Sequence, residues 1–298
     1  AAVVTRPDCV TSSALWGLAT SADFVLANTV VEAPVVNTLN GSFVPVLWWL
    51  HDAFAGYPFI SHSIPKALGK NVHLCAVGSH ATAAMHSVRP DFAIEQLIYG
   101  LPDYAAEQFP RYDISFVTVG SLEHRKGPDI FCNAIRLLPS AVREKAAFLF
   151  VGKAADKGMY NAVDSLVRDY PQTVFYRKRL ERPEVKSLME QCNCVVCASR
   201  DDPMPTFVTE GLIFGKPSIV SEHTGTAGLV TEGVDGFLYK DDDPQQLADK
   251  LAWAVEHPEA LAAMHGSCRR LYEQQFSNES YVATLTRLVK ELTDGEES

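Results

Sequence analysis

The chain has 298 residues, a formal net charge of −10, and 47% hydrophobic against 21% charged residues. This composition is typical of a globular protein with room for two ordinary domains, and the negative charge argues against a general surface for nucleic acid or anionic membranes. No apolar run approaches membrane-spanning length, and residues 1–5 are too short for a signal peptide. We therefore expect a cytoplasmic protein without a transmembrane segment.

Seven cysteines occur in the chain, several of them within apolar stretches that are typical of strands. Such placement favours reduced thiols, as expected in the cytoplasm. Cys192, Cys194 and Cys197 have a spacing that suggests a metal site, but they cross a helix end and a buried strand, and no further Cys or His lies nearby. The alternative of small core residues is favoured, and we expect no metal.

The first third of the chain alternates short apolar runs with weaker helical patterns. The pattern predicts a weak helix up to residue 40, a helix at 80–88 capped by Ser79, and strands at 23–29, 44–50, 72–77 and 94–98. Residues 102–112 show no clear periodicity, which predicts a linker.

A second α/β series follows. It predicts strands at 114–119, 147–151, 173–176, 193–198 and 217–220, helices at 128–138, 159–169, 183–191 and 206–214, two further helices within 243–276 broken near Pro258, and a last helix at 280–293. Alternation of strand and helix is typical of parallel, doubly wound sheets. We therefore predict an α/β fold with two Rossmann-like domains facing across a cleft. The first comprises residues 1–105 with 279–298 packed back on it, and the second residues 106–278.

Two carboxylates follow the predicted strand at 193–198. Asp202 lies in the loop after the strand, and Glu210 lies about one turn into the next helix. Ligands of open α/β sheets bind beside such loops, and the unpaired N–H groups of Thr206, Phe207 and Val208 suit anions and sugar hydroxyls. The competing interpretation is a helix cap and a surface charge, which stabilise the helix without a ligand.

A basic loop follows the predicted strand at 114–119. Arg125 and Lys126 precede Gly127 and Pro128, and a proline suits the first position of a helix. Two cations beside a helix start form a good diphosphate site, and the alternative is an ordinary solvated loop. The Gly-x-Gly-x-x-Gly pattern of NAD-binding proteins is absent from this loop.

Taken in order, these motifs resemble one family. The set comprises Val119-Gly120 with Lys126-Gly127, Asp202 and Glu210-Gly211 with seven residues between the carboxylates, Gly215-Lys216-Pro217, Gly225, and Gly233 to Phe237. It covers roughly residues 114–240 and is similar to the family-4 retaining glycosyltransferases. Before residue 100 the resemblance rests on a strand that ends in His51, a second that ends in Gly78-Ser79, and Tyr99-Gly100.

The resemblance implies a GT-B architecture, with the nucleotide-sugar donor held by the second domain and the acceptor by the first. It also implies metal-independent transfer with retained anomeric configuration. Fixed cations beside the leaving diphosphate can stabilise its negative charge without a metal ion. By position, the catalytic residues are His51, Asp202 at the transferred sugar and Lys126 at the diphosphate, and the donor is bound by Gly120, Arg125, Lys126, Thr206, Phe207 and, at the ribose, Glu210. The alternative for His51 is a histidine satisfied at a domain interface.

Four features depart from the family pattern. Asp202 replaces a commoner Glu, and Pro203-Met204-Pro205 replaces a Ser-Phe-Gly turn. Ser121 stands where an arginine usually joins the lysine, so Arg125 is the expected substitute, and Gly228 occupies the position of a frequent Glu. The first domain has about 100 residues where roughly 150 are usual. We expect either one module of a longer polypeptide or a shortened enzyme.

The resemblance thus implies a retaining, hexosyltransferase-like enzyme of polysaccharide or glycoconjugate synthesis. Its expected partners are a nucleotide-sugar donor and a glycan or glycoconjugate acceptor, without nucleic acid. Two rivals stay open. One is a non-catalytic nucleotide-sugar-binding module of a larger glycosyltransferase. The other is a GT-B sugar-nucleotide epimerase, which needs an acid/base pair that the sequence does not identify.

Overall fold

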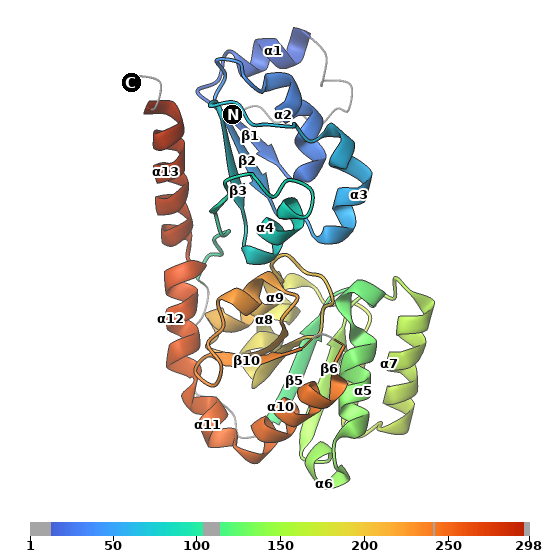
Figure 1. Cartoon of the computed structure of the whole chain (residues 1–298). Helices are drawn as coiled ribbons and strands as arrows, with labels where there is room; N and C mark the ends of the chain where they lie inside the picture. Colours follow the sequence, from blue (N-terminus) through green and yellow to red (C-terminus); the bar gives the residue numbers. More distant parts are fainter. Residues whose placement is uncertain (1–12, 104–113, 241, 295–298) are drawn as a thin grey trace. The chain divides into compact units, whose positions relative to one another are not determined.

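The computed structural model describes residues 13–103, 114–240 and 242–294 (Figure 1). Within these ranges no helix is long and apolar enough to cross a membrane. The linker predicted at 102–112 lies, apart from Pro102 and Asp103, outside the described residues.

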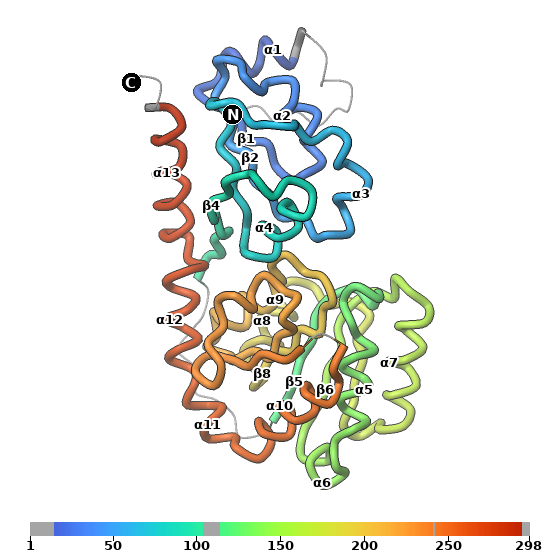
Figure 2. Tube along the Cα trace, in the orientation of Figure 1, coloured from blue at the N-terminus to red at the C-terminus, as the bar shows by residue number. Residues whose placement is uncertain are grey.

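The chain forms two compact units. Unit 1 comprises Ala1–Gly100 with Glu279–Ser298, and unit 2 comprises Leu101–Asn278. Figure 2 traces the two passages of the chain from one unit to the other. At the unit 2 end of these passages, the Leu101 N–H donates to the Phe276 carbonyl at 2.8 Å, and the Tyr272 hydroxyl donates to the Leu101 carbonyl at 2.6 Å. These bonds hold the two passages together within unit 2.

Unit 1 is built on a four-stranded parallel sheet in the order β1-β2-β3-β4. Its strands are β1 (Val25–Asn28), β2 (Val46–Leu50), β3 (Val72–Ala76) and β4 (Glu95–Gln96), and its helices are α1 (Ser13–Ala19), α2 (Ala33–Leu39), α3 (Tyr57–Ile60), α4 (Ser79–His86) and α13 (Asn278–Asp294). The sequence did not predict α1, and β4 is shorter than predicted. Ser79 is the first residue of α4 rather than its cap, because Gly78 occupies the N-cap position.

Strand β2 contributes buried side chains to both faces of the unit 1 sheet. Trp48 and Leu50 are fully buried on one face, and the indole N–H of Trp48 donates to the Thr29 carbonyl at 2.8 Å. Leu47 points to the opposite face, because side chains alternate along a strand. There it packs in a cluster with Cys75, Leu97 and Leu288 of α13, joined by Tyr281, Leu285 and Leu292. These apolar side chains of α13 therefore lie against the sheet of unit 1.

Unit 2 contains a six-stranded parallel sheet in the order β10-β9-β8-β5-β6-β7. Its strands are β5 (Ile114–Val119), β6 (Ala146–Val151), β7 (Val174–Arg177), β8 (Cys194–Cys197), β9 (Ser218–Ser221) and β10 (Gly236–Tyr239). Strand β10 was not predicted, because Gly233, with a φ of 73°, and Gly236 mark a turn and leave only a short apolar run after it. Parallel strands in both sheets confirm the predicted α/β class with two Rossmann-like sets of strands.

Helices cover both faces of this sheet (Figure 1). One face carries α5 (Pro128–Leu137), α7 (Lys157–Asp169) and α10 (Pro244–Glu256), and the other carries α8 (Arg182–Gln191), α9 (Thr206–Ile213) and α12 (His265–Gln275). The short helices α6 (Ser140–Arg143) and α11 (Pro258–Ala263) complete the unit. Residues 243–276 thus hold three helices, not two. Pro258 starts α11 as expected, and a second, slight break at Met264 keeps near-helical angles and leaves no signal in the sequence.

The strand order of unit 2 reverses between β5 and β8. These neighbours are paired, but β5 leads outward to β6 and β7, whereas β8 leads outward to β9 and β10. Their carboxyl-terminal loops therefore run to opposite faces of the sheet, toward α5 and toward α9. Such a reversal opens a crevice at the carboxyl ends of the strands.

Candidate functional site

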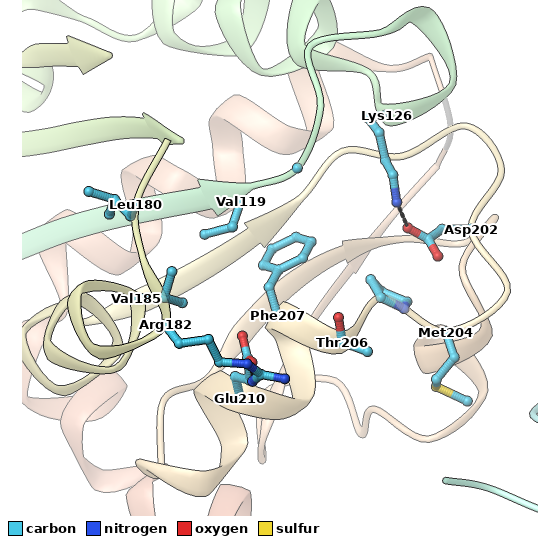
Figure 3. Close-up of a pocket in the computed structure, with 12 residues that line it drawn as sticks. Val119, Lys126, Leu180, Arg182, Val185, Asp202, Met204, Thr206, Phe207 and Glu210 are labelled. Carbon is cyan, nitrogen blue, oxygen red and sulfur yellow. Dashed lines mark hydrogen bonds and ion pairs between the residues drawn. The ribbon is translucent and has the colours of Figure 1, made fainter. Parts of the chain in front are cut away.

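A pocket of about 440 Å³ lies at this reversal point in unit 2 (Figure 3). The pocket is lined by the end of β5 and the loop after it, by the start of α8 with the residues before it, and by the first half of α9 with the loop before it. The lining residues are Val119, Gly120, Lys126, Leu180, Arg182, Val185, Asp202, Met204, Pro205, Thr206, Phe207 and Glu210. Six of the eight residues predicted for the site are among them. His51 and Arg125 are not.

The β5–α5 loop delivers Lys126 to the pocket. Residues His124–Lys126 form a single turn of 3₁₀ helix, after which Gly127 adopts a left-handed conformation with a φ of 62°. A Cβ at Gly127 would lie 1.9 Å from the Ala198 carbonyl oxygen, so only glycine fits where this loop crosses the end of β8. Pro128 then occupies the first position of α5, as predicted.

Lys126 and Asp202 meet at one end of the pocket (Figure 3). The Lys126 Nζ lies 2.5 Å from the Asp202 Oδ2, and the side chain of Asp202 is only 5% exposed. A carboxylate at this depth needs a charged or hydrogen-bonding partner. An ammonium has three N–H donors, and this contact occupies one of them.

The backbone of Asp202 is fixed by the loop after β9. Its N–H donates to the His223 carbonyl at 3.2 Å, and its carbonyl accepts from the Gly225 N–H at 2.9 Å. A Cβ at Gly225 would lie 1.6 Å from the Pro203 carbonyl oxygen. The close approach of these two backbone segments explains why a glycine occurs at position 225.

Helix α9 begins at the floor of the pocket. Pro205 occupies its N-cap and has no side chain that could accept a hydrogen bond. The N–H groups of Thr206 and Phe207 lie in the first turn, where the helix itself provides no carbonyl acceptor. Val208 was expected to offer a third N–H, but this group donates to the Pro205 carbonyl at 3.1 Å. Two backbone donors and the positive end of the helix dipole therefore face the pocket, rather than three donors.

Glu210 and Arg182 meet at the other end of the pocket (Figure 3). The Arg182 Nη1 lies 3.2 Å from the Glu210 Oε1, and the Glu210 side chain is 15% exposed whereas that of Arg182 is 83% exposed. Burial raises the pKa of the Glu210 carboxyl, and the guanidinium of Arg182 opposes that shift. An apolar wall of Val119, Leu180 and Val185 adjoins this pair.

Sequence reasoning missed the part of the site formed by Leu180, Arg182 and Val185. A signal existed, because a basic segment from Arg177 to Arg182 follows the strand predicted at 173–176. In a parallel sheet, that segment leaves at the same edge as the loops that carry Lys126 and Asp202.

The remaining two predicted residues lie elsewhere. The Arg125 guanidinium donates to the Asp201 carbonyl at 2.8 Å and pairs with Glu123 at 3.1 Å, so it does not line the pocket. His51 follows β2 in unit 1, where its ring stacks on Trp49 with 5.3 Å between centroids. Roles for both residues at the donor stay predictions.

The cysteines considered as metal ligands are buried in the core of unit 2. Burial raises the pKa of both Cys192 and Cys197 to about 12, which keeps these thiols protonated at neutral pH. Across the three described ranges, no group of three or more His, Cys, Asp or Glu side chains is placed to hold a metal ion.

The pocket therefore offers three chemically distinct regions: a cation beside a carboxylate, two helix N–H groups, and a second carboxylate beside an apolar wall. This arrangement suits a ligand with an anionic part, several hydroxyls and a flat apolar part.

Two families match the chain. The family described as Glycosyl transferases group 1 matches residues 104–270, which is more than half of the 298 residues. The family described as Glycosyl-transferase family 4 matches residues 2–91.

Individual relatives agree with these matches. The chain is 25% identical over 177 residues to an uncharacterised glycosyltransferase of Methanocaldococcus jannaschii, covering 59% of this chain and 48% of that protein. It is 30% identical over 134 residues to an alpha-1,4-N-acetyl-D-galactosaminyltransferase of Campylobacter jejuni, covering 45% of this chain and 36% of that protein. The matched region is thus about half or less of the length of these relatives.

A solved structure matches both sets of strands. The Anabaena protein HepE, solved in complex with UDP-glucose, superposes with a TM-score of 0.72 at 18% identity, covering 95% of this chain and 84% of HepE. At this level of identity the likeness establishes the fold.

Proposed function

The chain belongs to the group 1 glycosyltransferases and has the GT-B fold, and from this premise we propose that it transfers a sugar from a nucleotide-sugar donor to a glycan or glycoconjugate acceptor. The observation that carries the proposal is the pocket at the reversal point of unit 2. It places Lys126 and Asp202 at one end, Glu210 at the other, and the start of α9 between them.

We assign the parts of a donor to this pocket by their chemistry. The ammonium of Lys126 and the N–H groups of Thr206 and Phe207 suit the diphosphate. The Glu210 carboxylate suits the ribose hydroxyls, beside an apolar wall for the base. Asp202, in contact with Lys126, then lies where the sugar leaves the diphosphate and accepts hydrogen bonds from sugar hydroxyls.

Sugar transfer without a metal follows from the same assignment. Cleavage of the bond from the sugar to the diphosphate develops positive charge on the sugar and negative charge on the leaving group. A fixed ammonium and a helix N-terminus stabilise that negative charge, and the Asp202 carboxylate lies beside the positive charge. We infer retention of the anomeric configuration from the family.

A uridine nucleotide is the first donor to test, since HepE was solved with UDP-glucose. The purified chain is incubated with UDP-glucose, UDP-N-acetylgalactosamine, GDP-mannose or dTDP-glucose, with and without EDTA. Candidate acceptors are free oligosaccharides and a saccharide linked to a polyprenyl diphosphate. We expect labelled sugar to move to an acceptor with one donor, unaffected by EDTA, and NMR to show an unchanged anomeric configuration.

An Asp202→Asn variant is the control for contaminating activity, and it should lose transfer while still binding the nucleoside diphosphate. Binding of a donor without either transfer or hydrolysis would favour a non-catalytic binding module. Interconversion of two nucleotide sugars would favour an epimerase. No binding of any of these donors would contradict the proposal.

A further inference from the structure

Hydrogen bonds connect the loops that carry Lys126 and Asp202 beside the pocket, and most of these bonds involve Arg200. We propose that Arg200 is a positioning residue that holds Lys126 at the donor diphosphate while not touching the donor itself. This inference rests on the proposed function, because it concerns the placement of the cation that the donor would meet.

The side chain of Arg200 reaches across to the β5–α5 segment. Its guanidinium donates to both carboxylate oxygens of Asp129 in the first turn of α5, at 2.9 and 2.8 Å. The same group donates to the His124 carbonyl at 2.8 Å, two residues before Lys126. The Arg200 side chain is only 15% exposed and is therefore shielded from water. A bidentate pair between arginine and a carboxylate restricts the geometry of both groups, and it does so most strongly away from water.

The backbone strengthens the same connection in both directions. The Arg200 N–H donates to the Arg125 carbonyl at 2.8 Å, and the Arg125 guanidinium donates to the Asp201 carbonyl at 2.8 Å. Gly127 packs directly on the Ala198 carbonyl. The residues on both sides of Lys126 are thus bonded to the residues that precede Asp202.

A lysine side chain is long and flexible, so its ammonium is placed accurately only if its backbone is fixed. Arg200 also carries a charge at any physiological pH. Burial is the largest influence on the pKa of Asp129 and raises it, but the hydrogen bonds and the charge of Arg200, together with smaller local contributions, hold that pKa below its ordinary value. The ion pair between Arg200 and Asp129 therefore persists across the working range of pH and holds the two loops in a fixed relative position.

Arg200 lies outside the residues that line the pocket. Its removal should therefore affect the diphosphate through Lys126 and leave the nucleoside end of the pocket intact. A merely structural arginine would instead weaken every ligand alike, through lost stability. The two cases differ in a measurable way.

The test compares UDP with uridine by calorimetric titration of the whole chain; GDP or dTDP with its own nucleoside is used where a donor screen finds tighter binding. For Arg200→Ala we expect UDP affinity to fall at least fivefold and uridine affinity to change less than twofold. In a Lys126→Ala background, Arg200→Ala should weaken UDP by less than a further twofold, because the group it positions is already gone.

Two variants keep the test decisive. Arg200→Lys retains a cation but cannot serve both Asp129 oxygens and the His124 carbonyl, and it should show the same selective loss at smaller size. Arg136→Ala removes another arginine ion pair of α5, with Asp169, outside the pocket, and it should leave UDP affinity unchanged.

Equal weakening of UDP and uridine, or full additivity with Lys126→Ala, would overturn the positioning role. Such a result would leave the proposed function standing. Failure of the wild-type chain to bind any nucleoside diphosphate would instead contradict the proposed function itself.

Discussion

Lys126 and Asp202 are 76 residues apart in the chain, and their side chains form an ion pair of 2.5 Å in the pocket of unit 2. Each follows a different strand, β5 and β8, and these strands are neighbours at the point where the strand order reverses. The pair exists because the topology brings two carboxyl-terminal loops together there. Substitutions in either loop should therefore change the position of this pair in the pocket.

Gly127→Ala should displace the loop that carries Lys126. A left-handed conformation costs a non-glycine residue roughly 1–2 kcal/mol, and here the new methyl group would also meet the Ala198 carbonyl oxygen at 1.9 Å. We expect a loss of more than about 2 kcal/mol in urea unfolding, together with weaker UDP binding. Gly233→Ala is the matched control, because Gly233 has a φ of 73° but open space around it. It should cost only about 1 kcal/mol and leave UDP affinity intact; equal losses in both variants would contradict the close packing at Gly127.

Arg182→Ala should make nucleoside binding sensitive to acid. Burial raises the pKa of Glu210 and Arg182 opposes that shift, so removal of Arg182 raises this pKa further. Ribose hydroxyls bind the ionised carboxylate, so affinity is present above this pKa and is lost as the pH falls through it. Uridine affinity of the variant should then decline at a higher pH than that of the wild type, in titrations from about pH 8 to pH 5.

Uridine is the appropriate probe for this titration, because phosphate groups titrate near pH 6 and would obscure the effect. Glu210→Gln serves as the control, with weak binding that does not depend on pH. Identical pH profiles of uridine affinity for wild type and Arg182→Ala would contradict a role for Glu210 at the ribose.

Leu288→Ala should destabilise unit 1 selectively. Leu288 is fully buried against Leu47, Cys75 and Leu97, and truncation of such a leucine costs about 2–5 kcal/mol. Hydrogen exchange should show lost protection in β2 and β3, with β5 and β8 unchanged. Val282→Ala on the same helix is the control, since Val282 is 55% exposed and its truncation should cost about 0.5 kcal/mol or less. Uniform loss of protection in both units would contradict a place for Leu288 in the core of unit 1.

Local chemistry made most of unit 2 predictable from the sequence. Apolar β-branched runs mark its central strands, and Gly127-Pro128 marks the start of α5. Asp202 and Glu210 could be placed near each other because both follow one strand. Contacts between distant segments could not be predicted in this way. The pairing of Arg182 with Glu210 and the bonds from Arg200 to Asp129 depend on which strands are neighbours, and no local pattern specifies that order.

The most direct test of the donor site measures UDP and uridine binding to the wild type and to Lys126→Ala by calorimetric titration. Lys250→Ala is the control, because it removes an ion pair with Glu232 and lies outside the pocket. Loss of a charge-assisted hydrogen bond costs about 1.5–3 kcal/mol, so we expect UDP to bind Lys126→Ala roughly 10- to 100-fold more weakly, with uridine unchanged. Equal affinity of UDP for wild type and Lys126→Ala, or equal weakening of UDP and uridine, would contradict a diphosphate site at Lys126.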